Sequence, residues 1–233
     1  MIILDPGHGG ARPDGLPGID RGASAGGHNE SDVALLYASE LARALAARGV
    51  STWSTRTGEN LSLSLQERVR LANAKPGAEA FVSLHCNASG SPAAEGFQVF
   101  HARGSEKGAR LGASIVRAVA AGIMGLPRAP LVFPDQSVHC GYTQAARAHI
   151  ETLRPDLSWE KKDEAVRARF GKTNGYRRLL VLRETQMPAV LVELDFLTSP
   201  AARERLLDDG YRRALSDAIA LGICRWIHPF ADW

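Results

Sequence analysis

Near its start the chain reads Ile2-Ile3-Leu4-Asp5-Pro6-Gly7-His8-Gly9-Gly10. The apolar run Ile2–Leu4, which contains two β-branched residues, predicts a short buried strand. Pro6 and the glycines end this strand abruptly, so His8 is expected on a tight turn just past it. Ligands collect at that edge of open α/β sheets, and neutral imidazole is the commonest metal ligand. Taken alone, a histidine in a glycine-rich turn is more often structural than functional, so the rest of the chain has to decide.

Composition narrows the class of protein. The chain has 233 residues, which suits one domain over 1–233, and 45% of them are apolar, which supplies a sizeable core. A net charge of +3, from 28 basic and 25 acidic residues, permits an anionic polymer as partner without requiring one. No basic arm is present, so we expect no nucleic-acid partner. Three scattered cysteines without a CxxC pair suggest neither a disulfide framework nor a structural zinc knuckle.

The sequence also bears on where the protein works. No apolar run is long enough to span a membrane, so we expect no membrane span. Met1 leads directly into the first predicted strand, which leaves no room for a signal peptide. We therefore expect a protein that stays in the cytoplasm, one that leaves by another route, or one whose leader has been trimmed.

Apolar runs and helical patterns alternate along the chain. Strands are expected at 2–4, 50–56, 80–84, 96–101, 179–182 and 189–192. Helices are expected from Glu30, with Asn29 as N-cap, from the capping box at Ser64–Glu67, after residue 101, from Ser199-Pro200, and over 211–226. Such alternation predicts an α/β fold, in which one domain contains a mostly parallel, mixed and twisted sheet with helices on both faces.

Residues 127–172 interrupt this rhythm. Prolines punctuate the segment, and two short helices are expected at 143–153 and 160–169. We interpret it as an insertion on the scaffold that shapes substrate choice, or else as a peripheral extension. His139 and Cys140 are adjacent within it and could bind metal, but such a pair is more often incidental.

Four side chains are expected at one edge of the sheet. His8, His85 and Glu193 each follow an apolar strand, and Glu30 begins the helix after the first loop. Two histidines and a glutamate are a known ligand set for catalytic zinc, and a second carboxylate would serve metal-assisted hydrolysis as a general base. Each residue alone has a structural explanation, such as a solvated glutamate in a helix's first turn. The set of four is more specific than any member.

Five segments of the chain carry recognisable motifs: Asp5–Gly10, His28–Glu30 with Leu35 and Leu41, Thr55-Arg56 with Leu65, Arg68, Ala72 and Asn73, Ser83–Ala88, and Met187–Glu193. These motifs resemble those of a known family, the zinc-dependent N-acetylmuramoyl-L-alanine amidases of the Amidase_3 type, which cut peptidoglycan. The resemblance covers about 1–126 and 173–226. The resemblance implies that His8, Glu30 and His85 bind one zinc ion and that Glu193 is the general base.

The physical setting of the two glutamates agrees with this assignment. Glu30 lies in a helix's first turn, where the helix dipole favours a charged ligand. Glu193 follows a buried apolar strand, where desolvation should raise its pKa toward the working pH. Asn87 and Arg56 lie near the motifs and could contact substrate, although a loop hydrogen bond and a surface ion pair are at least as common for such residues.

Two departures from the family pattern concern substrate preference more than chemistry. Asp195 stands where the family usually has glycine, which could alter a turn or add charge near the cleft, and the segment 127–172 is long. A compact catalytic domain without a leader resembles a phage endolysin released through a holin, with a trimmed bacterial amidase as the alternative. Either would act on the cell wall, in the periplasm or outside the cell, and we expect a monomer whose partner is peptidoglycan.

Two functions of other classes stay open at this point. One is a zinc hydrolase of small N-acyl amino acids, which would lack a long open groove. The other is a wall-binding module with a decayed site, against which the complete set of four site residues argues.

Overall fold

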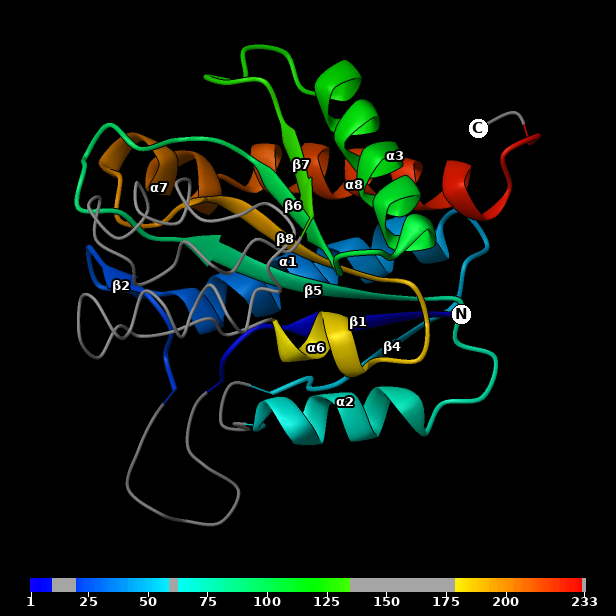
Figure 1. Ribbon diagram of the computed structural model, residues 1–233. Coiled ribbons are helices and arrows are strands. Elements are labelled where there is room, and N and C mark those ends of the chain that lie inside the picture. Colours follow the sequence, from blue (N-terminus) through cyan, green and yellow to red (C-terminus); the bar gives the residue numbers. More distant parts are fainter. Residues whose placement is uncertain (10–19, 59–62, 135–178, 232–233) are drawn as a thin grey trace, which may run out of the picture.

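The computed structural model describes residues 1–9, 20–58, 63–134 and 179–231 (Figure 1). Its centre is a six-stranded sheet with the strand order β4-β1-β5-β8-β6-β7. The strands are β1 (Ile2–Pro6), β4 (Thr52–Ser54), β5 (Ala80–Asn87), β6 (Gln98–His101), β7 (Leu131–Pro134) and β8 (Ala189–Phe196). Neighbouring strands are parallel except β6 and β8, which are antiparallel. The mostly parallel, mixed sheet predicted from the alternation of elements is therefore confirmed.

Helices cover both faces of this sheet, also as predicted (Figure 1). They are α1 (Glu30–Ala46), α2 (Leu65–Asn73), α3 (Glu106–Gly122), α6 (Leu180–Glu184), α7 (Pro200–Leu207) and α8 (Asp209–Ile227). Because side chains alternate along a strand, Ile2 and Leu4 pack in the larger core with α1, α3 and α8, while Ile3 and Phe81 pack in a smaller core with α2 and α6. In the described part of the chain, no helix has the length and apolar character needed to cross a bilayer.

The helix starts follow the local signals to different degrees. At α2 the capping box is complete, because the Ser64 side chain accepts from the Glu67 backbone and the Glu67 side chain accepts from the Ser64 backbone. Helix α1 begins after Asn29 as expected, but Asn29 makes no side-chain cap and instead donates to Asp32. A two-residue antiparallel pair, β2 (Ser24–Ala25) with β3 (His28–Asn29), leads into α1 and was not predicted.

Two sequence predictions were wrong. Residues 179–182 were expected as a strand but enter the helix α6, because a run of four apolar residues does not by itself distinguish a strand from a buried helix. The expected insertion at 127–172 begins too early, since Leu131–Pro134 forms β7, the edge strand beside β6. Pro130 precedes this short strand and Pro134 is its last residue, and prolines in a sequence argue against a strand. Residues 135–172, with His139, Cys140 and both expected short helices, lie outside the described residues.

Two strands also run further than predicted. β5 continues past His85 to Asn87, and β8 continues past Glu193 to Phe196. His85 and Glu193 are therefore near the carboxyl ends of their strands rather than beyond them, and only His8 stands outside its strand. β5 lies between β1 and β8 and is parallel to both, so the carboxyl ends of the three strands lie at one edge of the sheet.

Candidate metal centre

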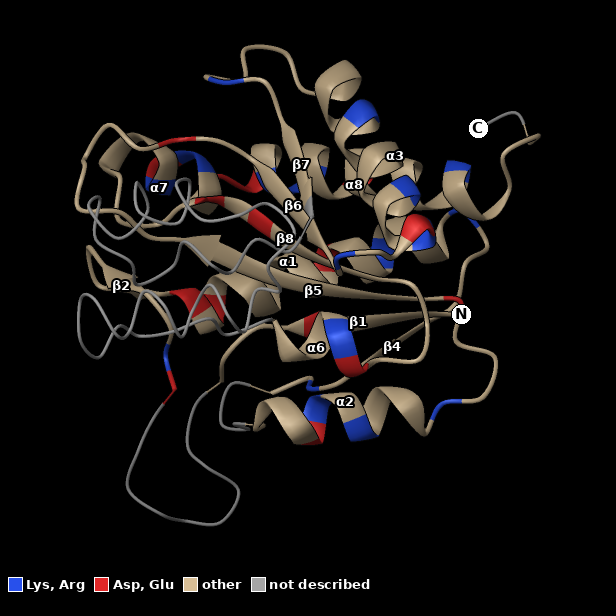
Figure 2. Ribbon diagram, in the orientation of Figure 1, with Lys and Arg blue, Asp and Glu red and all other residues tan. Residues whose placement is uncertain are grey.

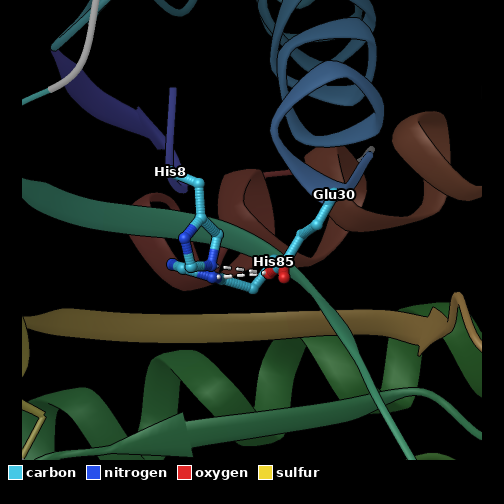
Figure 3. Close-up of side chains that lie close together, drawn as sticks. All are labelled: His8, Glu30 and His85. Carbon is cyan, nitrogen blue, oxygen red and sulfur yellow. Dashed lines mark hydrogen bonds and ion pairs between the residues drawn. The ribbon is translucent and has the colours of Figure 1, made fainter. Parts of the chain in front are cut away.

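Three side chains converge at that edge (Figure 3). His8, Glu30 and His85 each offer one ligand atom, and these atoms lie within 4.8 Å of one another. They come from the turn after β1, the first residue of α1 and the strand β5, so residues 77 positions apart in sequence meet here. Figure 2 shows acidic residues at the start of α1 and in the carboxyl half of β8, on the same side of the molecule.

Glu30 contacts both imidazoles, which pack edge to face with their ring centroids 4.9 Å apart (Figure 3). Its Oε1 lies 3.1 Å from Nε2 of His8 and 2.8 Å from Nδ1 of His85, and it also accepts the backbone N–H of Cys86 at 3.0 Å. Its Oε2 accepts the backbone N–H of Ala23 at 2.8 Å. Burial alone would raise the pKa of this carboxyl, but the hydrogen bonds from His8 and His85 outweigh it and hold the pKa well below its usual range. Glu30 is therefore an anion aimed at both histidines.

His8 has a carboxylate on each side of its ring. Nδ1 lies 2.7 Å from Oδ1 of Asp20, while Nε2 faces Glu30. Burial opposes protonation, but the bonds to Asp20 and Glu30 raise the pKa of His8 to about 9. The site therefore favours a positive charge between these groups. A carboxylate behind a histidine is also the arrangement that orients metal-binding histidines in proteins.

Two glycines allow the backbone to approach the three side chains. A Cβ atom at Gly7 would overlap the ring of His85. A Cβ atom at Gly22 would overlap both Glu30 and the ring of His8, and Gly22 has a φ of +66°, which favours glycine. The turn after β1 and the loop before α1 therefore close around the site only because these residues lack side chains.

Glu193 lies next to His85 across the sheet. In the register of β5 and β8 the two residues are direct partners, so their side chains share one face. Oε2 of Glu193 is buried without a hydrogen-bond partner among the described residues. Burial raises the pKa of Glu193 to about 7, with His85 opposing and Glu30 reinforcing the shift. The direction of this shift is the one expected from desolvation, and Oε2 keeps no hydrogen-bond partner among the described residues.

The donor set agrees with zinc. Two imidazole nitrogens and one carboxylate oxygen are the three protein ligands typical of a catalytic zinc site that keeps its fourth position open. The buried, unpartnered oxygen of Glu193 beside His85 leaves a group available to act on whatever occupies that position. The residues present therefore fit a zinc ion, and a second carboxylate, Asp20, stands behind one of the ligands.

Sequence reasoning missed Asp20 and misjudged Arg56. Asp20 follows a stretch of sequence rich in glycine and proline and belongs to no local motif, so only its contact with His8 reveals it. Arg56, considered for substrate contact or a surface ion pair, is 2% exposed and donates to backbone carbonyls instead. Its position in the Thr55-Arg56 motif carried no signal of burial, because arginine is rarely buried unless it is paired.

Two other residues near the motifs have structural partners. Asn87 donates from Nδ2 to Oε1 of Gln98 at 3.0 Å, a hydrogen bond between residues of β5 and β6 instead of the loop hydrogen bond considered above. Asp195 is buried and pairs with Arg205 at 2.9 Å, and it accepts the backbone N–H of Gly96 at 2.8 Å. Its charge is therefore neutralised within the fold, so Asp195 ties the loop before β6 to α7 instead of adding a free charge near the site.

We expect Asp20→Asn to weaken zinc binding without unfolding the chain. The amide keeps the shape of the carboxylate but removes the charge that orients His8, and loss of such a partner typically costs about 10–100-fold in metal affinity. Competition with a chromophoric chelator would measure the dissociation constant. The control is Asp209→Asn on α8, a surface carboxylate paired with Arg212 at 2.7 Å. Equal zinc affinities for Asp20→Asn and the parent chain would contradict the orienting role.

Fold and site together define an α/β domain with a candidate metal centre of two histidines and a carboxylate. The family model described as N-acetylmuramoyl-L-alanine amidase matches residues 2–225. This chain belongs to that family.

Relatives of this chain carry the same description. It is 31% identical over 237 residues to N-acetylmuramoyl-L-alanine amidase AmiC of Neisseria meningitidis, covering 98% of this chain and 53% of the relative. It is 29% identical to amidase AmiA of Salmonella typhimurium, covering 99% of this chain and 77% of the relative. The chain thus spans about half the length of the first of these proteins.

Solved structures agree on the fold. Amidase AmiC2 of Nostoc punctiforme matches with a TM-score of 0.68 and 25% identity, covering 97% of this chain and 96% of that one. An N-acetylmuramoyl-L-alanine amidase of Clostridium difficile matches with a TM-score of 0.70 at 22% identity, over 99% and 97% of the two chains. The α/β arrangement described above is therefore that of amidase catalytic domains.

Proposed function

We propose that this chain hydrolyses the amide bond between N-acetylmuramic acid and L-alanine in peptidoglycan. One zinc ion would be held by His8, Glu30 and His85, with Glu193 as the general base. The observation that carries the proposal is the convergence of the three ligand atoms within 4.8 Å, in a chain that belongs to the amidase family. Glu193 is the partner of His85 in the sheet register, which puts a carboxylate beside the ligand set.

The bound cation and the side chains of the protein would make different contributions to the reaction. Zinc, when bound, would polarise the substrate carbonyl and lower the pKa of water toward neutrality. Glu193 would take the proton from the attacking water and return it to the nitrogen of the departing L-alanine. A pKa of about 7, raised by burial, suits a group that must both accept and release a proton near neutral pH. Glu30, held ionised by both histidines, suits a ligand instead.

We also propose where this chain acts, how many domains and subunits it has, and what shapes its substrate choice. The relatives of this chain include a protein of Staphylococcus aureus named "Probable cell wall amidase LytH", and we propose that this chain likewise acts on the wall outside the cytoplasm. We propose that residues 1–233 are one catalytic domain that works as a monomer. We also propose that the long segment after β7 shapes substrate choice, because long loops on a rigid scaffold often carry binding residues.

Zymography on purified peptidoglycan, with and without a chelator, tests the function. We expect a cleared band that the chelator abolishes and that added zinc restores. The digest should contain new L-alanine amino termini, measured by amine labelling, without new reducing sugar ends, because the amide and not the glycan is cut. Amine release in the presence of excess chelator would contradict a metal-dependent mechanism.

The same assay separates the alternative functions. A hydrolase of small N-acyl amino acids would release amines from N-acetyl-L-alanine but none from peptidoglycan. A decayed wall-binding module would sediment with peptidoglycan but release no amines. Either result would overturn the proposed activity.

A further inference from the structure

Two buried arginines hold the backbone of the turn that carries His8. Arg68 donates to the carbonyl oxygen of Pro6 at 2.7 Å and to that of His8. Arg56 donates from Nε to the same Pro6 carbonyl at 3.1 Å and from Nη2 to that of Gly7 at 2.8 Å. Every carbonyl from Pro6 to His8 therefore accepts a hydrogen bond from a guanidinium group.

The turn needs such support because His8 has an unfavourable backbone. Its φ of +57° makes it the one non-glycine residue with positive φ in the described part of the chain. The left-handed conformation is unfavourable for a residue with a Cβ atom, and it persists only where the surroundings impose it. The guanidinium contacts with the carbonyls on both sides of Gly7 provide that constraint.

Arg56 also contacts the start of α1. Its Nη2 also donates to the carbonyl oxygen of Ser31 at 2.7 Å, and Ser31 directly follows Glu30. One amino group therefore joins the residue before His8 to the residue after Glu30. These two candidate ligands come from separate segments, the turn after β1 and the start of α1, which Arg56 ties together.

The charge of Arg56 argues against a purely packing role. Arg68 pairs with the buried carboxylate of Asp5 at 2.7 Å, whereas no described carboxylate lies within 4.0 Å of the Arg56 guanidinium. Burial, with Arg68 nearby, lowers the pKa of Arg56 to about 10, so it stays cationic near neutral pH. A buried charge without an ionic partner generally lowers stability relative to an apolar side chain of similar volume. Arg56 therefore contributes to the structure through its hydrogen bonds to backbone carbonyls.

We propose that Arg56 is a positioning residue that fixes His8 and Glu30 relative to each other before a metal ion binds. The inference rests on the zinc site of the proposed function. Lysine cannot replace Arg56 in this role, because a single ammonium lacks the planar fork that reaches the carbonyls of Pro6, Gly7 and Ser31 at once.

Zinc affinity of Arg56→Lys, measured on the full chain by chelator competition, tests this. We expect a loss of about 10–100-fold, the size typical for groups that orient metal ligands. Arg48→Lys is the matched control, since Arg48 donates to the Ala44 carbonyl at 2.9 Å and to Asp217 at 3.2 Å, between α1 and α8. Both variants are also unfolded in urea, so that a general loss of stability is recognised. The control should bind zinc as the parent chain does.

A second variant, Arg56→Met, removes the buried cation and so separates positioning from charge. It also provides the test if the lysine variant does not fold. A purely electrostatic role predicts tighter zinc binding when this cation is removed, whereas positioning predicts weaker binding. The absorption spectrum of the Co²⁺-loaded protein adds a readout of ligand geometry, which should change in Arg56→Met and not in Arg48→Lys.

The outcomes distinguish the two proposals. Unchanged or tighter zinc binding in the Arg56 variants, beside a parent chain that binds zinc, would overturn the positioning role alone. A parent chain that binds no zinc would overturn the proposed function and this inference with it. Weaker binding confined to the Arg56 variants, with an altered Co²⁺ spectrum, would support both.

Discussion

Replacing Glu193 with glutamine should lower the rate of amide cleavage by about 10²–10⁴-fold while zinc content and fold are retained, because a positioned acid–base group is typically worth that much. Glutamine has nearly the same shape as glutamate but cannot accept the proton from water. Oε2 of Glu193 has no hydrogen-bond partner among the described residues, so the substitution breaks no bond there. Amine release from peptidoglycan and zinc analysis of the same samples would measure both quantities.

Glu30→Gln is the informative companion to this variant. Glu30 accepts from both histidines and from two backbone N–H groups, so its neutral amide should weaken metal retention first. Glu95→Gln, which alters a carboxylate paired with Arg205 at 3.3 Å, controls for the substitution itself. Near-normal turnover in Glu193→Gln would remove Glu193 from the mechanism, and zinc loss in that variant would make it a ligand.

Substituting either histidine with alanine should abolish stoichiometric zinc binding. The parent chain is expected to retain about one zinc ion through three protein ligands, and either substitution leaves two ligands. The loss of zinc affinity should exceed the roughly 100-fold loss that follows removal of a group that only orients a ligand. Metal analysis after dialysis against a weak chelator would measure it for His8→Ala and His85→Ala. His101→Ala is the control, because His101 ends β6, which runs antiparallel to β8, and its Nδ1 faces the carbonyl of the adjacent Ala102.

The two histidine variants should differ in their effect on stability. Alanine at position 8 still has to adopt a φ of +57°, and it loses the bonds to Asp20 and Glu30. His85 lies in the regular strand β5, where alanine introduces no backbone strain. We therefore expect His8→Ala to lower the free energy of unfolding more than His85→Ala. Full zinc retention by both variants would contradict the ligand assignment.

Local sequence signals were sufficient where short-range contacts decide the structure. The Ser64–Glu67 capping box formed as predicted, since its partners are three residues apart. Apolar character alone does not predict which side chains of a helix are buried, since in α1 Leu36 is 49% exposed whereas Tyr37 is buried. The strand predicted at 179–182 was wrong because a helix and a strand can bury four apolar residues equally well. Which of the two forms depends on the tertiary contacts of the segment.

For the candidate site, the sequence by itself determined which residue types stand at the strand and helix ends. An alternating α/β chain with a mostly parallel sheet brings those ends to one edge, so the order of elements is enough to group His8, Glu30, His85 and Glu193. Their roles in metal binding and catalysis stay predictions. Only the tertiary structure decided that Glu30 contacts both imidazoles and that Oε2 of Glu193 has no partner among the described residues. It also decided that Asp20 contacts His8 and that Arg56 bonds to Gly7 and Ser31. Those contacts join segments whose approach depends on strand order, register and the glycines at 7 and 22, which no local pattern encodes.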